Sequence, residues 1–398
     1  MRTICLDKDL PRILLAKALQ PFWPGVVFSP LSPTRMVEMP DPPLPGPRWV
    51  RLRNRFSGIC ASDLHLLFLE ADLGVSPVAL PGSARTYLGH EVVSEVVEVG
   101  PAVTTLQTGD RVIMDSGTNC LTQEIVPPCR HCQEGNYGLC ENVALGHSPS
   151  GIGGGWGDGY IAHERAVYRV PRQVGNDAAV LLEPLSVGVR TALRRLPQPG
   201  EHALVLGCGM IGLAVIAALR ALAPDSHITA LARYSHQAAV AGRLGADRVL
   251  ERTDPYAAAV EITGAKLYAG LLNNRMLLGG FDVVYDCVGT ARTLQDSLRL
   301  ARAGGTVVLA GVSFHSLRVD LTPIWYQEVN LVGLLGHGME EWGGTRRSTY
   351  DLTLELLQAG RLPTEGLITH RFPLAQWRTA ARTAARKRTG AIKVVLEC

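Results

Sequence analysis

Hydrophobic and polar positions divide this chain into stretches with different periods. Up to about residue 182, short apolar runs such as VVSEVVEV (92–99) and RVIM (111–114) alternate with turn signals rich in Gly, Pro and Asp. Short runs at this spacing predict a mostly β domain. Residues 10–47 contain many prolines and no clear period, so we expect an irregular surface segment there.

From about residue 183 to 340, strand-like runs alternate with helical stretches. The strand-like runs are ALVLG, ITALA, DVVYDCVG, GTVVLAG and NLVGLLG, and the helical stretches include HQAAVAGRLGAD and TLQDSLRLARAGG. This alternation predicts βαβ units around a parallel sheet. The fold class is therefore α/β, with a mostly β domain over 1–182 and a doubly wound parallel-sheet domain over 183–340. Residues 341–398 hold two amphipathic helix candidates and the strand AIKVVLE, which we expect to return to the first domain.

Composition and charge limit the classes of molecule that the protein is expected to bind. Hydrophobic residues make up 46% of the 398 residues and charged residues 19%, which is typical of a folded protein with sizeable cores. The formal net charge is +3, and no long Lys/Arg block occurs, so neither nucleic acid nor an anionic membrane is expected as a partner. A small molecule is the expected ligand.

The first residues and one apolar stretch bear on localisation, and the cysteines bear on disulfide bonds and metal binding. The first residues include Asp7, Lys8 and Asp9 and do not resemble a secretory signal, so we expect a cytoplasmic protein. The apolar stretch 203–219 contains three spaced glycines and predicts a strand, a turn and a helix, not a membrane span. An odd count of nine cysteines argues against a disulfide framework, and the four between 120 and 140 suggest a metal site.

A dinucleotide site is predicted where G-x-G-x-x-G follows the run EHALVL and precedes LAVIAALRAL. The first Gly makes the turn, the second lets the backbone approach a pyrophosphate, and the third lets the helix pack on the strand. The alternative is a purely structural glycine turn. The expected cofactor-binding residues in this turn and at the ends of two later runs are Gly207, Gly209, Met210, Ile211, Gly212, Val288 and Gly311.

The next strand-like run bears on the type of nicotinamide cofactor. An acidic residue about 20 positions after the glycine turn would bind the ribose hydroxyls of NAD. Here Ala232 stands at that place and Arg233 follows, and a guanidinium pairs well with a 2′-phosphate. We therefore expect a preference for NADP(H), with NAD(H) as the alternative if Arg233 only stacks on adenine.

Metal-binding and proton-transferring side chains gather in three short motifs. Cys60, Ser62, Asp63 and His65 lie within six residues, and the pair His90-Glu91 follows 30 residues after Cys60; a third motif is LEPL, which contains Glu183. A catalytic zinc takes about three Cys, His or carboxylate ligands and keeps one position open. Taken singly, these residues have ordinary explanations, such as a buried cysteine, a core histidine or a helix N-terminal acid.

These motifs together resemble the zinc-containing medium-chain dehydrogenase/reductase family. The patterns GICxSDxH, GHE, GDRV, a cysteine lobe, EP and the glycine turn occur in the family's order, from about residue 48 onwards. The resemblance implies a GroES-like catalytic domain, a Rossmann domain and an active site in the cleft between them. It implies Cys60 and His90 as zinc ligands, Glu183 at the third ligand position, and Glu91 as a carboxylate that binds directly or exchanges with Glu183.

The family's chemistry is hydride transfer between an alcohol, polyol or sugar hydroxyl and a nicotinamide, with zinc acting as a Lewis acid. The resemblance implies that Ser62 bonds the substrate oxygen and that His65 passes the proton to solvent. Asp63 is expected to orient a ligand such as His90, and loop capping is the alternative role of Ser62 and Asp63. The sequence EPLSVG looks more like the polyol, threonine and sugar dehydrogenase branches than the branch with a third cysteine.

A second zinc site is expected at the cysteine lobe, although the pattern departs from the family's. Cys129, Cys132 and Cys140 give C-x2-C-x7-C, and the family's first cysteine would fall at Val126. Cys120 is the nearest candidate for the fourth ligand, since tetrahedral thiolate coordination limits ligand positions and not loop length. The alternatives are His131 as a ligand or an empty lobe. Residues from about 8 to 32 are extra relative to the family, and the sequence leaves open whether they cover the cleft or an oligomer contact.

Other functions remain as alternatives. The same site run in reverse would make an aldehyde or ketone reductase. A zinc-free quinone or enoyl reductase uses the same scaffold but lacks the Cys60, His90 and Glu183 set, and a non-enzyme relative would have lost a ligand or Ser62. The resemblance also implies a homodimer or homotetramer. The glycine-rich stretch 151–160, with Trp156, is expected to form a surface turn, and an approach to the cleft is the alternative.

Overall fold

The computed structural model describes residues 1–76, 84–115, 117–143 and 151–398. The chain forms two compact units, of which the first contains 1–183 and 368–398 and the second contains 184–367. The return to the first unit thus begins later than the expected position of about 341. Residues 341–367 stay with the second unit because helix α10 (Thr349–Gln358) is buried there, where Ser186 Oγ lies 3.1 Å from Thr353 Oγ1.

The first unit is built on a mostly antiparallel sheet in which β7 (Gly159–His163) pairs with β3 (Trp49–Gly58). The remaining strands follow the order β19-β20-β3-β5-β6-β8, with bounds β19 (Ile368–Pro373), β20 (Lys393–Glu397), β5 (Val92–Val99), β6 (Arg111–Met114) and β8 (Val167–Arg169). A smaller sheet has the order β2-β1-β4, with bounds β2 (Thr34–Glu38), β1 (Arg2–Asp7) and β4 (Arg85–Tyr87). Alternate residues of β3, such as Val50 and Leu52, are buried, because successive side chains of a strand point to opposite faces of the sheet.

The N-terminal segment is more regular than expected. Residues 10–47 contain helix α1 (Leu10–Leu19), a 3₁₀ turn (Pro24–Phe28) and strand β2, so the prediction of an irregular segment was wrong for these parts. The Asp9 carboxylate accepts the Arg12 N–H at 3.3 Å and a proline occupies the first turn of the helix, where its missing N–H costs nothing. Ile13 and Ala16, three residues apart, form the buried face.

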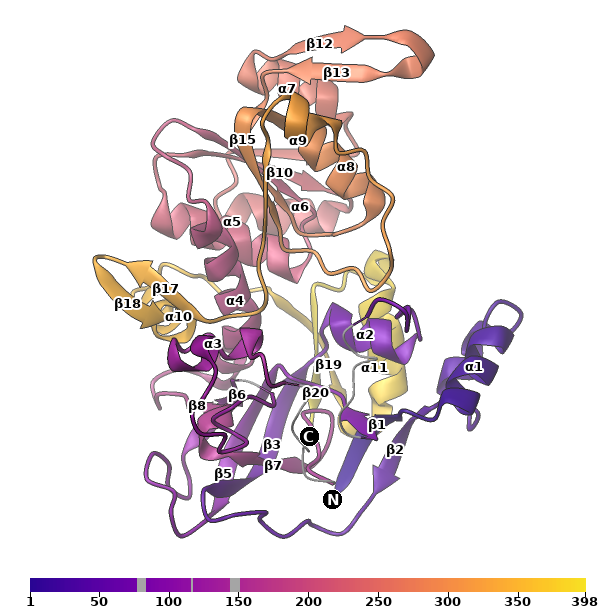
Figure 1. Cartoon of the computed structure of the whole chain (residues 1–398), viewed down its shortest axis with the longest axis vertical. Helices are drawn as coiled ribbons and strands as arrows, with labels where there is room; N and C mark the ends of the chain where they lie inside the picture. The colour runs from indigo at the N-terminus through magenta and orange to yellow at the C-terminus, as the bar shows by residue number, and fades with distance from the viewer. Residues whose placement is uncertain (77–83, 116, 144–150) are drawn as a thin grey trace. The chain divides into compact units, whose positions relative to one another are not determined.

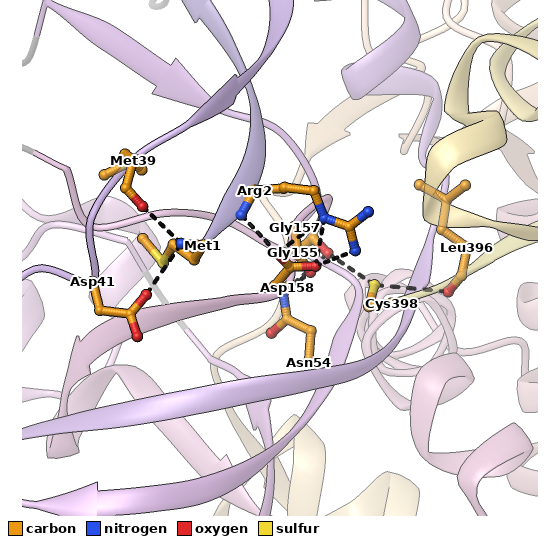
Figure 2. A network of polar contacts seen from close by, with 10 residues as sticks. All are labelled: Met1, Arg2, Met39, Asp41, Asn54, Gly155, Gly157, Asp158, Leu396 and Cys398. Carbon is orange, nitrogen blue, oxygen red and sulfur yellow. Dashed lines mark hydrogen bonds and ion pairs between the residues drawn. The ribbon is translucent and has the colours of Figure 1, made fainter.

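The glycine-rich stretch 151–160 lies inside the first unit, and the expectation of a surface turn for Trp156 was wrong. Trp156 is fully buried, and its indole N–H donates to Gly58 O at 3.3 Å. Figure 2 shows how the neighbouring backbone is held: the Asn54 side-chain amide donates to Gly157 O at 2.9 Å, and the Arg2 guanidinium pairs with Asp158 at 2.7 Å. Glycine is required here because the chain passes close to neighbouring backbone and a Cβ would collide with it.

The second unit contains a six-stranded parallel sheet in the order β11-β10-β9-β14-β15-β16. This is the strand order of a Rossmann fold, with the reversal between β9 and β14, and it confirms the doubly wound prediction. The strand bounds are β9 (His202–Leu206), β10 (His227–Ala232), β11 (Arg248–Glu251), β14 (Phe281–Asp286), β15 (Ala301–Leu309) and β16 (Asn330–Gly333). The helices are α5 (Met210–Leu222), α6 (Ser235–Arg243), α7 (Pro255–Thr263), α8 (Ala291–Leu300) and α9 (Thr322–Tyr326), and α4 (Asn176–Arg194) runs from the first unit into the second.

Two antiparallel hairpins of the second unit were not foreseen. One joins β12 (Lys266–Ala269) to β13 (Arg275–Leu278), and the other joins β17 (Met339–Trp342) to β18 (Thr345–Ser348). Figure 1 shows the first hairpin extending away from α7 and α8 of its own unit. Within the part of the chain that the structure describes, no helix has both the length and the apolar character needed to cross a membrane.

Candidate active site

Strand β3 turns into helix α2 (Ala61–Leu67) at the residues of the first motif. Gly58 ends the strand, and a Cβ at this position would collide with the Glu91 carboxylate. Cys60 then stands at the N-cap of α2, in extended backbone conformation, so that Ser62, Asp63 and His65 all lie on this short helix. The spacing of the motif is therefore the spacing of one strand–helix turn.

Asp63 joins the two loops that carry the first two motifs. Its carboxylate, 3% exposed, accepts the Cys60 N–H at 3.1 Å through Oδ2 and the Gly89 N–H at 3.0 Å through Oδ1. The same Oδ1 lies 3.5 Å from His90 Nδ1. Burial would raise the pKa of Asp63, but the His90 charge and these hydrogen bonds outweigh burial and hold the pKa below its usual value.

Cys60, His90 and Glu91 form a compact cluster. Their potential ligand atoms all lie within 4.8 Å of one another. Loss of solvent opposes the charged form of His90, but the negative charges of Asp63 and Cys60 outweigh it and hold the pKa of His90 well above its usual value. One soft sulfur, one imidazole and one carboxylate in this space match the donor set of a catalytic zinc, and the surplus of acidic groups favours a cation.

Glu183 lies close to this cluster without belonging to its compact set. Burial raises the pKa of Glu183 to about 7; Glu91 and Asp63 add to the rise, and His90 and Lys393 oppose it. The carboxylate is therefore within electrostatic reach of the same groups. Of the two acids expected to compete for the third position, the structure groups Glu91 with Cys60 and His90.

Lys393 is a site residue that the sequence did not reveal. Its ammonium group, 3% exposed, donates to both oxygens of Glu91 at 2.7 and 2.5 Å and lies 3.4 Å from Ile59 O. Strand β20 places it there because β20 pairs with β3 next to Gly58. The two charged residues are 302 positions apart, and no local pattern connects them.

The expected proton-transfer residues both lie on α2. Ser62 is half-buried, and its hydroxyl makes no hydrogen bond to another residue of the described ranges. His65 is 31% exposed, and its Nδ1 lies 2.5 Å from Oε2 of Glu70. Sequence reasoning missed Glu70, because a carboxylate five residues after a histidine indicates contact only if the chain turns back.

The four cysteines of the lobe come together, with Cys120 among them. Their sulfur atoms all lie within 4.8 Å of one another, and Cys120 Sγ is 3.7 Å from Cys140 Sγ. A tetrahedral zinc site with Zn–S bonds of about 2.3 Å separates its sulfurs by about 3.8 Å. The cysteines in this group are Cys120, Cys129, Cys132 and Cys140.

Backbone N–H groups favour the thiolate form of Cys129 in this lobe. Those of Cys132 and Glu141 lower the pKa of Cys129 to about 7, whereas burial raises the pKa of Cys132 and of Cys140. The Asn142 side-chain amide also points at Cys120 Sγ, at 3.2 Å. His131, the alternative fourth ligand, is not part of the group, and this donor set fits a four-thiolate metal site.

The glycine turn follows β9 and opens α5. Gly207 has φ = 96°, which favours glycine, and a Cβ at Gly212 would collide with Gly207 O. Gly209 is the N-cap of α5, and a Cβ there would have no heavy atom within 4 Å. Two glycines thus close the turn and the third leaves an open approach to the helix N-terminus, whose first residues are Met210 and Ile211, which suits a pyrophosphate.

The other expected cofactor residues lie at the same edge of the parallel sheet. A Cβ on Gly207 would collide with Val288, which follows β14, and one on Gly311, beyond β15, would collide with Gly289. Ala232 ends β10 and is buried, and Arg233 follows it with its guanidinium exposed, 5.6 Å from the Tyr234 ring. The strand ends therefore present the groups of a dinucleotide crevice at the point of strand reversal.

Comparisons with known families match both units. Residues 46–172 match the alcohol dehydrogenase GroES-like domain, and residues 210–350 match the zinc-binding dehydrogenase domain. A sorbitol dehydrogenase of Arabidopsis thaliana is 32% identical over 89% of this chain and 89% of its own length. An L-idonate 5-dehydrogenase of Vitis vinifera is 32% identical over 83% of this chain and 82% of its own.

Solved structures agree in fold. The 2R,3R-butanediol dehydrogenase of Bacillus subtilis is similar with a TM-score of 0.70 at 24% identity, covering 92% of this chain and 96% of its own. A candidate zinc-binding dehydrogenase of Sinorhizobium meliloti 1021, solved with NADP bound, has a TM-score of 0.69 at 26% identity and covers 92% and 95%. The matches to both units and the two relatives at 32% identity show that the chain belongs to the zinc-containing medium-chain dehydrogenase/reductase family, as a zinc- and nicotinamide-dependent oxidoreductase of alcohol hydroxyls.

Proposed function

We propose that this enzyme transfers a hydride between a secondary hydroxyl of a polyol or sugar-type alcohol and NADP(H). The cluster of Cys60, His90 and Glu91 carries the proposal, because it supplies the donor set for a catalytic zinc. Relatives named sorbitol dehydrogenase, L-idonate 5-dehydrogenase and D-xylulose reductase favour polyhydroxylated substrates. The half-buried Ser62 and the partly exposed His65 provide the proton path.

Cys60, His90 and Glu91 would hold the catalytic zinc, with Glu183 as the exchanging carboxylate. When bound, zinc supplies Lewis acidity that lowers the pKa of a substrate hydroxyl. Asp63 keeps His90 oriented by lying 3.5 Å from its Nδ1, and Lys393 holds Glu91 in place through two short hydrogen bonds. Cys120, Cys129, Cys132 and Cys140 would hold a structural zinc.

Proton movement is assigned to two side chains of α2. The Ser62 hydroxyl bonds the substrate oxygen, takes up its proton and gives up its own hydroxyl proton in the same step. His65 takes that proton and releases it to water, because part of its ring is exposed. The nicotinamide supplies the hydride chemistry when bound, and the protein positions it.

Preference for the 2′-phosphorylated cofactor rests on Ala232 and Arg233. No carboxylate follows β10 to repel the phosphate, and the exposed Arg233 guanidinium can pair with it. The dehydrogenase of Sinorhizobium meliloti solved with NADP is consistent with this choice. Reduction of an aldehyde or ketone uses the same groups in reverse and remains the second direction of the same reaction.

The test is a panel of polyols, sugars and simple secondary alcohols assayed with NADP and NAD. We expect a secondary polyol hydroxyl to give the highest kcat/KM and NADP to exceed NAD by at least about tenfold, since a guanidinium–phosphate pair contributes roughly 1.5–3 kcal/mol. Arg233→Ala should remove most of that difference, and a wild-type preference for NAD would refute the cofactor assignment.

The metal assignment has a separate test. Cys60→Ala should lose one zinc per chain and lower activity by more than about 100-fold, because the open metal position is lost. Cys5→Ala, which changes a buried cysteine of β1 outside both clusters, serves as the matched control. Full activity and full zinc content in Cys60→Ala would overturn the assignment.

A further inference from the structure

The chain turns back on itself directly after α2. Phe68 N donates to Leu64 O at 2.8 Å as the helix ends, and Leu69 has φ = 54°, a left-handed conformation uncommon for leucine. The turn brings Glu70 back to His65 at two points. Glu70 N donates to His65 O at 2.9 Å, and Glu70 Oε2 lies 2.5 Å from His65 Nδ1.

The N-terminal insertion fastens this turn. Leu69 is 6% exposed and packs in a cluster with Leu6 and with Ala16 of α1. From the same helix, the Lys17 ammonium donates to Ala71 O at 2.8 Å. The unfavourable backbone of Leu69 is therefore compensated by burial against α1, which lies in the segment that the sequence predicts to be an insertion.

Two further contacts from the insertion hold Phe68, the residue before Leu69. The side-chain amide of Gln20 donates to Phe68 O at 2.9 Å. The Phe28 ring packs edge-on against the Phe68 ring, with centroids 5.9 Å apart. Residues 68–71 are thus held on both sides of Glu70, whose side chain is not itself part of the packed interface and is 47% exposed.

The contact between Glu70 and His65 sets the proton arrangement of the imidazole. An ionised carboxylate accepts hydrogen bonds and cannot donate, so Nδ1 of His65 must carry the hydrogen. The lone pair of the neutral ring then lies on Nε2. A carboxylate on the far nitrogen also stabilises the imidazolium that forms when Nε2 takes a proton, as in other His–carboxylate pairs.

We propose that Glu70 is a positioning residue of the proton path, which fixes the His65 tautomer, and that the N-terminal insertion exists in this enzyme to hold it there. The proposal rests on the proposed function in one respect, that His65 takes the substrate proton. For each alcohol oxidised, one hydride goes to the nicotinamide and one proton goes to Nε2. The imidazolium stays bonded to Glu70 and then gives this proton to water or to a buffer base.

The tautomer can be measured without any turnover, by ¹⁵N NMR of the His65 ring. We expect the Nδ1–H form in the wild type and a shift towards Nε2–H in Glu70→Leu. Glu70→Gln retains an acceptor oxygen and should keep part of the Nδ1–H form. An unchanged ring signal in Glu70→Leu would overturn the proposal, whatever the enzyme's substrate is.

Kinetics test the consequence for the reaction. Glu70→Leu should lower kcat for alcohol oxidation by roughly 3- to 30-fold with little change in KM, a part of the 10²–10⁴-fold effect of general acid–base catalysis. Rising buffer concentration should restore the rate, since an external base replaces the path. Asp72→Ala removes a carboxylate that bonds the Gly74 N–H in the same loop and is the control. A tautomer shift without a rate effect would refute the role of His65 and leave the positioning intact.

A separate double variant tests whether the insertion holds Glu70. The double change Lys17→Ala/Gln20→Ala removes both donors to residues 68–71, and we expect the same NMR and rate changes with smaller size. Leu14→Ala alters the exposed face of the same helix, where the side chain is 54% exposed, and should change neither. If the double variant retains the wild-type tautomer and rate, the insertion does not hold Glu70.

Discussion

At the scale of single residues, Glu91 and Lys393 form a buried ion pair in the first unit. Both side chains are at most 3% exposed. Removing one partner from such a pair leaves an uncompensated buried charge, which costs far more than the pair contributes by existing. The site therefore depends on a lysine that contributes no electron pair to a metal.

Lys393→Met is expected to lower the free energy of unfolding of the metal-free protein by about 3–5 kcal/mol. Urea denaturation at constant pH measures this loss. Lys393→Met/Glu91→Met should recover most of it, because no buried charge remains. The control is Arg51→Met, which breaks a more exposed pair with Glu98 and should cost less than about 1 kcal/mol. A loss as small as that of the control would contradict the argument.

Candidate site residues could be named from the sequence where their neighbours in space are also neighbours in the chain. Cys60, Ser62, Asp63 and His65 could be recognised because one strand–helix turn carries all of them. Lys393 could not be recognised, because its partner lies on a different strand and the pairing of β20 with β3 is a tertiary event. Glu70 was missed because its contact with His65 depends on the left-handed turn at Leu69, which the sequence does not reveal.

At the scale of elements, the sequence predicted β9, the glycine turn and α5 at the correct positions and with the correct secondary structure. Each of its three glycines has its own structural role in the turn, and their spacing in the sequence therefore predicts the turn. Helix α1 was missed because prolines around it suggested irregular chain, although a proline in the first turn favours a helix start. The β12–β13 and β17–β18 hairpins were missed because each interrupts the βαβ alternation with short strands.

Gly209→Ala and Gly212→Ala should separate cofactor binding from folding. In Gly209→Ala the new methyl group meets open space, so we expect unchanged stability but at least about tenfold weaker NADPH binding, because the methyl blocks the approach of the pyrophosphate. In Gly212→Ala the methyl meets Gly207 O, and both properties should be lost. Fluorescence titration and thermal denaturation measure the two effects.

The control for this pair is Gly242→Ala, the next-to-last residue of α6, where a Cβ meets nothing within 4 Å. We expect it to raise stability by roughly 0.5–1 kcal/mol, since alanine favours helix more than glycine does. NADPH binding equal to the wild type in Gly209→Ala would show that the turn does not contact the cofactor.

At the scale of the whole molecule, the residues expected to bind metal lie in one unit and those expected to bind the cofactor lie in the other. Both metal clusters belong to the first unit, and the glycine turn with Arg233 belongs to the second. A ligand that binds only the folded state stabilises what it binds, by about 2.7 kcal/mol at 100 times its Kd. Metal and cofactor should therefore protect different parts of the chain.

Hydrogen exchange followed by mass spectrometry measures this division. A chelator should speed exchange mainly in peptides of 1–183 and 368–398, and NADPH should slow it mainly in 184–367. Gly209→Ala should lose the response to NADPH and keep the response to the chelator. Equal responses of both units to the chelator would contradict a metal role confined to the first unit.

The distance along the chain between Glu91 and Lys393 has a consequence for synthesis on the ribosome. At about 5–20 residues per second, 302 residues take roughly 15–60 s to translate. Throughout that interval the nascent chain already contains Cys60, His90 and Glu91 but lacks the lysine that neutralises the carboxylate. An ion captured during translation therefore meets a more anionic binding site than an ion offered to the completed enzyme.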